Sequence, residues 1–168
     1  KLTGQPASTL NVVRTWSDTY LSEQVDAFRR RSSNGMIREC HGDLHLQNIV
    51  KWRGRLVPFD GIEFNDDFRW IDIISDAAFL AMDLAAREHL DLSRGFVNSY
   101  LEKTGDYGGL AVLRWYLVYR SLIRAMVAQM NADQHAEESE IAENAMQDCR
   151  HHIELAYRYT LNEQPSLT

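Results

Sequence analysis

The sequence is short of several features that would place it in familiar classes of protein. Its 168 residues include only two cysteines, Cys40 and Cys149, which lack a C-x-x-C spacing and are too few to frame a disulfide-stapled fold. Acidic residues outnumber basic ones, 24 against 18, so there is no basic excess of the kind that binds nucleic acid. No segment approaches the roughly 20 apolar residues that span a bilayer. We therefore expect a cytoplasmic protein with neither nucleic acid nor membrane as a partner.

The composition that is present suits a folded domain. Hydrophobic residues make up 45% of the chain and charged residues 25%, which favours one enclosed core over disorder. The first residues contain neither an apolar secretory segment nor an initiator methionine. We expect the sequence to start inside a longer protein.

The first third of the chain predicts one helix and a hairpin. Apolar residues recur at three- to five-residue steps over 15–31, which indicates an amphipathic helix. Residues 36–40 read as an extended segment, and two short strands over 49–52 and 56–59 follow, joined by a turn at Arg53-Gly54. This turn pairs residue 49 with 58 and residue 48 with 59.

The rest of the chain is helical in pattern. The predicted helices cover 70–88, 93–103, 110–132 and 137–161, with glycine and asparagine punctuation between them. We predict an α+β fold that is predominantly helical. Its domain is expected over 15–164, after a linker over 1–14 and before a frayed tail over 165–168.

The residues that indicate chemistry flank the hairpin. Residues 41–48 read H-G-D-L-H-L-Q-N before it, and residues 59–64 read F-D-G-I-E-F after it. The hairpin brings Asn48 and Asp60 together at its open end, and Asp43 lies in the loop that leads there. Two carboxylates and an amide oxygen are hard ligands that suit Mg²⁺. We expect Asp43 to accept the proton of an attacking hydroxyl, and Asn48 and Asp60 to hold Mg²⁺, in a phosphoryl transfer.

The run H-G-D-L-H-x-x-N-I, followed about a dozen residues later by a hydrophobic residue and Asp, resembles a known family. It is similar to the catalytic and metal-binding loops of the aminoglycoside phosphotransferase and choline kinase family, relatives of protein kinases. By this resemblance Asp43 matches the catalytic Asp, Asn48 the metal-binding Asn and Asp60 the metal-binding Asp. The resemblance implies a protein-kinase-like C-terminal lobe. It also implies transfer of the γ-phosphate of ATP, with GTP as the alternative donor, to a small-molecule hydroxyl on an aminoglycoside, choline or a sugar.

The same resemblance suggests roles for four more residues. Asp76 matches an Asp that hydrogen-bonds the catalytic loop, and Asp72, expected one helical turn earlier, competes with it for that role. Glu63 matches an acid that touches a second metal in some relatives. His41 is expected to hold the loop through hydrogen bonds rather than to carry a proton.

The half of such a kinase that binds the nucleotide is not recognisable in this sequence. A glycine-rich strand-turn, a strand lysine and a helix glutamate should precede the catalytic loop, and none is recognisable before Thr15. The resemblance therefore covers the C-terminal lobe, and we expect the N-terminal lobe elsewhere in the same polypeptide. Without it, we expect no turnover by these 168 residues alone.

Two other functions fit the same residues. One is a pseudokinase-like module that binds nucleotide or a partner without catalysis, although intact Asp43, Asn48 and Asp60 argue against it. The other is a metal-dependent hydrolase that uses the same carboxylates and releases phosphate without an acceptor.

Several charged and metal-binding side chains have competing interpretations. A zinc site is disfavoured because adjacent histidines on a helix point about 100° apart and structural zinc sites use closely paired ligands. Its candidate ligands are Cys40, His41, His45, Cys149, His151 and His152. Acids could line a pocket for a cationic substrate or simply face water, and arginines on one helix could reach an anionic substrate or pair with neighbouring helices. The acids are Asp66, Asp67, Glu137, Glu138, Glu140 and Glu143, and the arginines are Arg114, Arg120 and Arg124.

Overall fold

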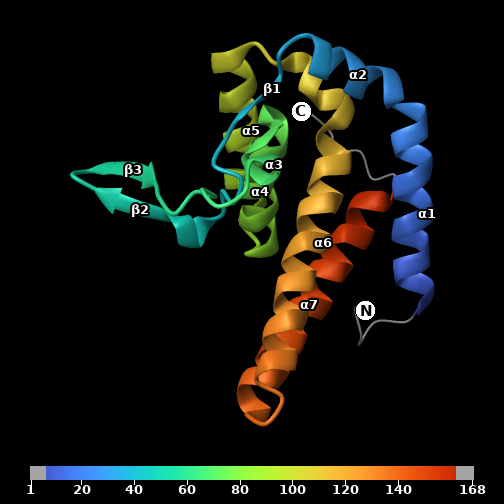
Figure 1. Ribbon diagram of the computed structural model, residues 1–168, viewed down its shortest axis with the longest axis vertical. Coiled ribbons are helices and arrows are strands. Elements are labelled where there is room, and N and C mark those ends of the chain that lie inside the picture. Colours follow the sequence, from blue (N-terminus) through green and yellow to red (C-terminus); the bar gives the residue numbers. More distant parts are fainter. Residues whose placement is uncertain (1–6, 162–168) are drawn as a thin grey trace. The chain divides into compact units, whose positions relative to one another are not determined.

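The computed structural model describes residues 7–161, and the chain divides into two compact units. One unit is formed by the residues up to Leu21 together with those from Val118 onward, and the other by Ser22–Leu117. Helices dominate, and two small antiparallel sheets accompany them (Figure 1). The prediction of a predominantly helical α+β fold is confirmed. None of the helices in the described part is long and apolar enough to cross a membrane.

The Ser22–Leu117 unit contains all the residues that the sequence assigns to the catalytic and metal-binding loops and to their support. Its elements are α2 (Val25–Ser33), β1 (Ile37–Glu39), η1 (Leu46–Asn48), β2 (Ile49–Trp52), β3 (Arg55–Pro58), α3 (Asp66–Arg69), β4 (Trp70–Asp72), α4 (Ile73–Ala86), α5 (Leu90–Thr104), η2 (Tyr107–Gly109) and the first part of α6 (Leu110–Gln134). The helices predicted over 93–103 and 110–132 are confirmed as α5 and α6, with ends that differ by a few residues.

The register of the β2–β3 hairpin is the one that the sequence predicts. Ile49 lies opposite Pro58, and the Phe59 N–H donates to the Asn48 carbonyl over 2.9 Å. Hairpin pairing is set locally by the turn, so a correct turn fixes every later pair. The hairpin therefore carries Asn48 and Phe59 to its open end as a hydrogen-bonded pair.

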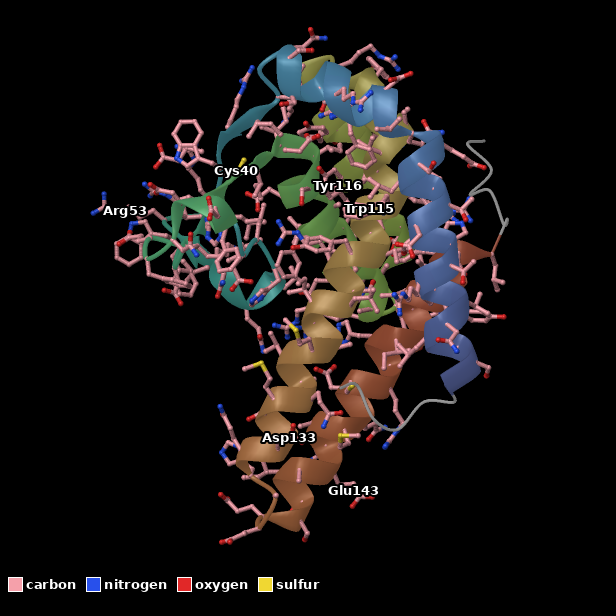
Figure 2. The ribbon with its side chains drawn as sticks, turned by 45° about the vertical axis from the view of Figure 1, so that its right-hand side comes forward. Cys40, Arg53, Trp115, Tyr116, Asp133 and Glu143 are labelled. Atoms are coloured by element: carbon pink, nitrogen blue, oxygen red, sulfur yellow. The ribbon has the colours of Figure 1, made fainter. Side chains whose placement is uncertain are left out.

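The hairpin turn is tight, and its side chains face solvent. Arg53 and Gly54 have φ values of 48° and 78°, as a two-residue type I′ turn requires. The hairpin extends away from the helices of its unit (Figure 1), and Arg53 lies at its tip (Figure 2). Trp52 and Leu56 are 63% and 75% exposed. The hairpin is thus held by its own ladder more than by burial.

A second sheet replaces the first turn of an expected helix. The sequence predicts a helix from Trp70, but Trp70–Asp72 forms β4 and pairs with β1, with Ile37 opposite Asp72. The Asp72 side chain accepts a hydrogen bond from the Ile74 N–H over 3.1 Å and so caps α4 at its start. The helix consequently begins at Ile73.

The helix α4 is the centre of this unit's core. Every residue from Ile74 to Ala85 is buried. Ile74 and Ala77 pack with Ala27 of α2 and Val112 of α6. Aromatic and aliphatic side chains that surround this cluster are Phe28, Phe96, Tyr100, Leu113 and Tyr116. Removing these apolar surfaces from water is what fixes α4 in place.

The other unit is built from three helices. They are α1 (Ala7–Glu23), the end of α6, and α7 (Ser139–Thr160), the last matching the helix predicted over 137–161. Val13 is 1% exposed and packs with Val118 and Ala156. Apolar burial between helices thus accounts for this unit as well.

The N-terminal helix differs from the prediction in two ways. The sequence suggests a linker over 1–14 and one helix over 15–31, but α1 already begins at Ala7 because Leu10 and Val13 pack into the core of its unit. The helix is also interrupted at Gln24, whose carbonyl accepts hydrogen bonds from the Ala27 and Phe28 N–H groups as α2 starts. The rest of the expected linker, residues 1–6, and the tail expected over 165–168 lie outside the described residues.

Candidate catalytic and metal-binding loop

Residues 41–48 form a loop between β1 and β2 whose backbone depends on Gly42. This residue has a φ of 84°, a conformation that side chains with a Cβ rarely adopt. A Cβ added at Gly42 would lie 2.7 Å from the Phe68 carbonyl oxygen. The glycine of the H-G-D run therefore lets the chain pass close to the Phe68 backbone just before Asp43.

Asp76, in the first turn of α4, holds the start of this loop. Its two carboxylate oxygens accept hydrogen bonds from the His41 N–H over 2.9 Å and from the Gly42 N–H over 3.1 Å. Asp76 is only 8% exposed. A buried carboxylate that receives two backbone N–H groups fixes the direction of the chain, because losing either bond would leave a desolvated polar group.

Asp83 holds the other end of the loop and was not singled out from the sequence. Its Oδ2 accepts the Leu46 N–H over 2.8 Å, at the start of η1, and the residue is 3% exposed. Asp76 and Asp83 are seven positions apart, so they share one face of α4. An acid seven positions after Asp76, within an otherwise apolar run, was the signal that could have identified it.

Asp43 and Asn48 are in direct contact between these two anchors. The Asn48 side-chain N–H₂ donates to the Asp43 carbonyl and to its Oδ2, both over 3.0 Å. Because both partners are oxygens, the amide nitrogen must face them and the Asn48 Oδ1 must point away. That oxygen has no hydrogen-bond partner among residues 7–161. The Asp43 side chain is 39% exposed, so solvent can reach it.

Asp60 follows directly after the Asn48–Phe59 backbone pair. It has a φ of 58°, which turns the chain sharply at this point, and it is exposed. The structure thus brings the side chains of Asp43 and Asn48 together. It places Asp60 one residue after Phe59, the backbone partner of Asn48. Across residues 7–161, no group of three or more His, Cys, Asp or Glu side chains is arranged to hold a metal ion. The proposed set differs from such a group because one of its three members is an amide.

His41 ties the loop to the segment that follows the hairpin. Its ring Nε2 lies 2.8 Å from the Phe59 carbonyl oxygen, and its own carbonyl accepts the Ile62 N–H over 2.9 Å. A ring nitrogen facing a carbonyl must carry the hydrogen, so Nε2 is the donor. These contacts fit the expected structural role for His41.

Two other residues proposed from the sequence make no hydrogen bond to the loop in the described chain. Glu63 is exposed and makes no hydrogen bond or ion pair within the described chain. Asp72 was expected to compete with Asp76, but it belongs to β4, where it caps α4 and binds Arg31 through paired contacts of 2.7 and 2.8 Å. The support role expected of Asp72 is therefore wrong, because its carboxylate is fully engaged elsewhere.

Arg31 is the centre of a buried charge network that the sequence did not predict. Besides Asp72, it donates to Asp106 over 2.6 and 2.7 Å, and the Tyr100 hydroxyl donates to Asp106 over 2.8 Å. Burial alone would raise the pKa of Asp106, but the hydrogen bonds from Arg31 and Tyr100 outweigh it and lower this pKa. Burial raises the pKa of Tyr100, and the charge of Asp106 adds to the shift. The network links α2, β4 and the segment after α5.

The cysteines and histidines considered for zinc belong to two different units of the chain. His41 faces Phe59, and the Cys40 Sγ lies 3.7 Å from the Ile71 carbonyl oxygen. Cys149 and His152 lie in α7, in the other unit.

Comparison with known proteins gives relatives of this chain without a described activity. Three curated proteins match it, one from Mycobacterium bovis and two from strains of Mycobacterium tuberculosis, each described as an uncharacterized protein. Each is 36% identical over 110 residues, which is 66% of this chain. The chain spans 22% of the length of these relatives. No protein-family model and no solved structure matches the chain.

Proposed function

We propose that this chain is the catalytic-loop part of a Mg²⁺-dependent phosphotransferase that acts on a hydroxyl of a small molecule. The observation that supports it most is the contact between Asp43 and Asn48 on a loop whose ends are held by two buried carboxylates of α4. The similarity of residues 41–48 and 59–64 to the aminoglycoside phosphotransferase and choline kinase family supports the same function. By that similarity the Ser22–Leu117 unit belongs to a protein-kinase-like C-terminal lobe. The low cysteine content favours a cytoplasmic location for the enzyme.

In this proposal Asp43 acts as the general base. The acceptor oxygen forms a bond to the γ-phosphorus of ATP while the bond from that phosphorus to the bridging oxygen of the β-phosphate breaks. ADP leaves with the electron pair of the broken bond, and the hydroxyl proton passes to the Asp43 carboxylate and then to water. GTP is the alternative donor. A half-exposed carboxylate held by Asn48 meets the requirement for orientation of the hydroxyl.

The donor set near the loop is suited to Mg²⁺ by its chemistry. Asn48 directs its amide nitrogen at Asp43 and so turns its oxygen outward, and Asp60 adds an exposed carboxylate one residue beyond the Asn48–Phe59 pair. Mg²⁺ favours this kind of sparse oxygen set, completed by phosphate and water. When bound, the ion would offset negative charge on the phosphates. Glu63 is a further oxygen donor close in sequence to Asp60.

The phosphate clamp belongs, in this proposal, to another part of a longer polypeptide. The glycine-rich strand-turn, strand lysine and helix glutamate that hold the phosphates in such kinases are not recognisable before Thr15. The isolated 168 residues are then expected to show no ATP turnover.

A test uses the longer protein that contains this chain. Transfer from labelled ATP to a panel of small alcohols is measured with Mg²⁺ and with EDTA, beside nucleotide affinity by calorimetry. Asp43→Asn should lower transfer by about 10²-fold or more and leave nucleotide affinity within a few-fold, because a base acts on the barrier and not on binding. Asp91→Asn, an exposed acid at the start of α5, is the matched control. Equal rates for Asp43→Asn and the unmodified protein would refute the proposal.

A pseudokinase-like interaction module is the second candidate, and exposed apolar residues favour it. Trp52, Leu56 and Phe64 are 63%, 75% and 84% exposed. Exposed apolar groups of this size often mark a surface that contacts a partner. Nucleotide binding without transfer to any acceptor would favour this candidate, and phosphate release without an acceptor would favour a hydrolase.

A further inference from the structure

His45 is buried beside the proposed base, and its environment is unusual for a polar side chain. It is 5% exposed, and its Nε2 lies 3.2 Å from the Asp43 Oδ2. The other ring nitrogen, Nδ1, is buried and finds no hydrogen-bond partner within the described chain. The ring instead packs against Phe79 of α4, with centroids 5.6 Å apart.

These contacts define which nitrogen of His45 carries hydrogen. The Asp43 carboxylate is an acceptor when ionised, so the nitrogen facing it must donate. A hydrogen on Nδ1 would be buried without an acceptor, which is unfavourable. A hydrogen on Nε2 of His45 therefore lies nearest to the Asp43 carboxylate, 3.2 Å from Oδ2.

Two side-chain nitrogens lie close to the same oxygen of Asp43. The Asn48 amide lies 3.0 Å from Oδ2, and the His45 Nε2 lies 3.2 Å from it. One hydrogen bond lets a carboxylate swing about its Cβ–Cγ bond, whereas a buried ring nitrogen of a second residue, 3.2 Å away, restricts that rotation. The backbone supports the arrangement, since the Asn48 N–H donates to the His45 carbonyl and the His45 N–H to the Asp43 carbonyl.

The His45 ring is itself positioned by α4. Phe79 lies between Asp76 and Asp83 along the helix, so one face of α4 meets the start, the middle and the end of the loop. His45 is the middle contact. Through its contacts with Phe79 and with Asp43, the ring connects α4 to the Asp43 carboxylate.

We propose that His45 is a positioning residue that sets the orientation of the Asp43 carboxylate toward the acceptor hydroxyl; this rests on the proposed function of Asp43. His45 acts through Asp43 and does not itself touch the reacting atoms.

The kinetic test compares two polar replacements in the longer protein. The amide nitrogen of Gln reaches as far from the backbone as Nε2 of His, whereas that of Asn stops near the position of Nδ1. His45→Gln should keep kcat within about threefold, and His45→Asn should lower kcat by about 10- to 100-fold with the KM for ATP little changed. Both leave a polar group in the same buried site, so their melting temperatures should be similar. His89→Asn, on an exposed histidine before α5, is the control.

A structural readout separates this inference from the proposed function. In the longer protein labelled with ¹⁵N-histidine, His45 should give the Nε2–H tautomer, and Asp43→Asn should shift its Nε2 signal while leaving that of His89 in place. If no acceptor is phosphorylated but this shift occurs, the kinase function fails and the positioning contact stands. Equal kcat values for the Gln and Asn variants, or a His45 signal that ignores Asp43→Asn, would overturn the inference.

Discussion

Asp76 and Asp83 lie seven positions apart on α4, and their carboxylates hold opposite ends of the same loop. The first receives the N–H groups of His41 and Gly42, and the second receives that of Leu46. Asp43 lies between the two anchors. The loop is therefore shaped by a helix that is distant from it in sequence.

The anchor at Asp83 can be tested without knowledge of the substrate. Asp83→Ala leaves the Leu46 N–H without its acceptor inside the fold, so we expect a loss of about 1–3 kcal/mol in the free energy of unfolding. Asp83→Asn keeps an oxygen acceptor and should lose less. Urea unfolding and amide exchange at Leu46 measure the two effects. Unchanged Leu46 protection in Asp83→Ala would contradict this role, and Asp91→Ala serves as the exposed control.

Gly42 should tolerate no side chain. Gly42→Ala combines a φ of 84° with a Cβ placed 2.7 Å from the Phe68 carbonyl oxygen, so we expect a loss of roughly 1–3 kcal/mol in unfolding free energy. Gly95, inside α5, has no such neighbour within 4 Å, and Gly95→Ala should stabilise by about 0.5–1 kcal/mol. We therefore expect Gly42→Ala to lower the free energy of unfolding and Gly95→Ala to raise it. A Gly42→Ala variant as stable as the parent would show that the loop follows another path.

The buried Arg31 network predicts a dependence of stability on acid. The pKa of Asp106 is lower in the folded chain than its ordinary value of 3.8, so the unfolded chain takes up this proton first as the pH falls. The stabilisation is complete above the unfolded value and is lost as the pH drops through the folded pKa. Urea unfolding from about pH 6 to about pH 2 should show this loss, and Asp106→Asn should reduce it. An identical slope in Asp106→Asn would exclude this origin, and exposed Asp67→Asn is the control.

The hairpin turn offers a gain in stability. Arg53 adopts a left-handed conformation that Asn accepts more readily, so Arg53→Asn should relieve part of a cost of about 1–2 kcal/mol. The change also removes the guanidinium that lies 5.7 Å from the Trp52 ring centroid, worth about 0.5 kcal/mol at an exposed site. Arg53→Ala loses this contact without the relief. Amide exchange in β2 and β3 should therefore be slower in the Asn variant than in the Ala variant, and the reverse order would contradict the turn assignment.

Local features of the fold could be predicted from the sequence, and long-range ones could not. The hairpin register follows from Arg53-Gly54 because pairing across a two-residue turn needs no distant information. The strand β4 was missed because its partner, β1, lies some thirty residues earlier, and the residues Trp70–Asp72 fit a helical pattern equally well. Arg31 was missed for the same reason, since its partners Asp72 and Asp106 are 41 and 75 positions away.

The candidate site likewise combines local relationships, which could be predicted from the sequence, with long-range ones, which could not. Asp43 and Asn48 could be paired because they are five positions apart in one motif, and the structure gives them direct contact. Asp83 lies in an apolar run, where the sequence alone marks it only as an interruption. The structure shows that its carboxylate binds the Leu46 N–H of the loop. His45 was considered only as a zinc ligand, because nothing in a linear sequence shows that its ring is buried between Asp43 and Phe79.

Because every residue of α4 from Ile74 to Ala85 is buried, this helix has no face that is exposed to solvent over these residues. A substitution that shifts α4 even slightly therefore displaces the Asp76 and Asp83 carboxylates and the Phe79 ring together. If the proposed function holds, changes that alter the choice of substrate are more easily accommodated in segments that do not contact α4, because they leave the anchors of the Asp43 loop in place.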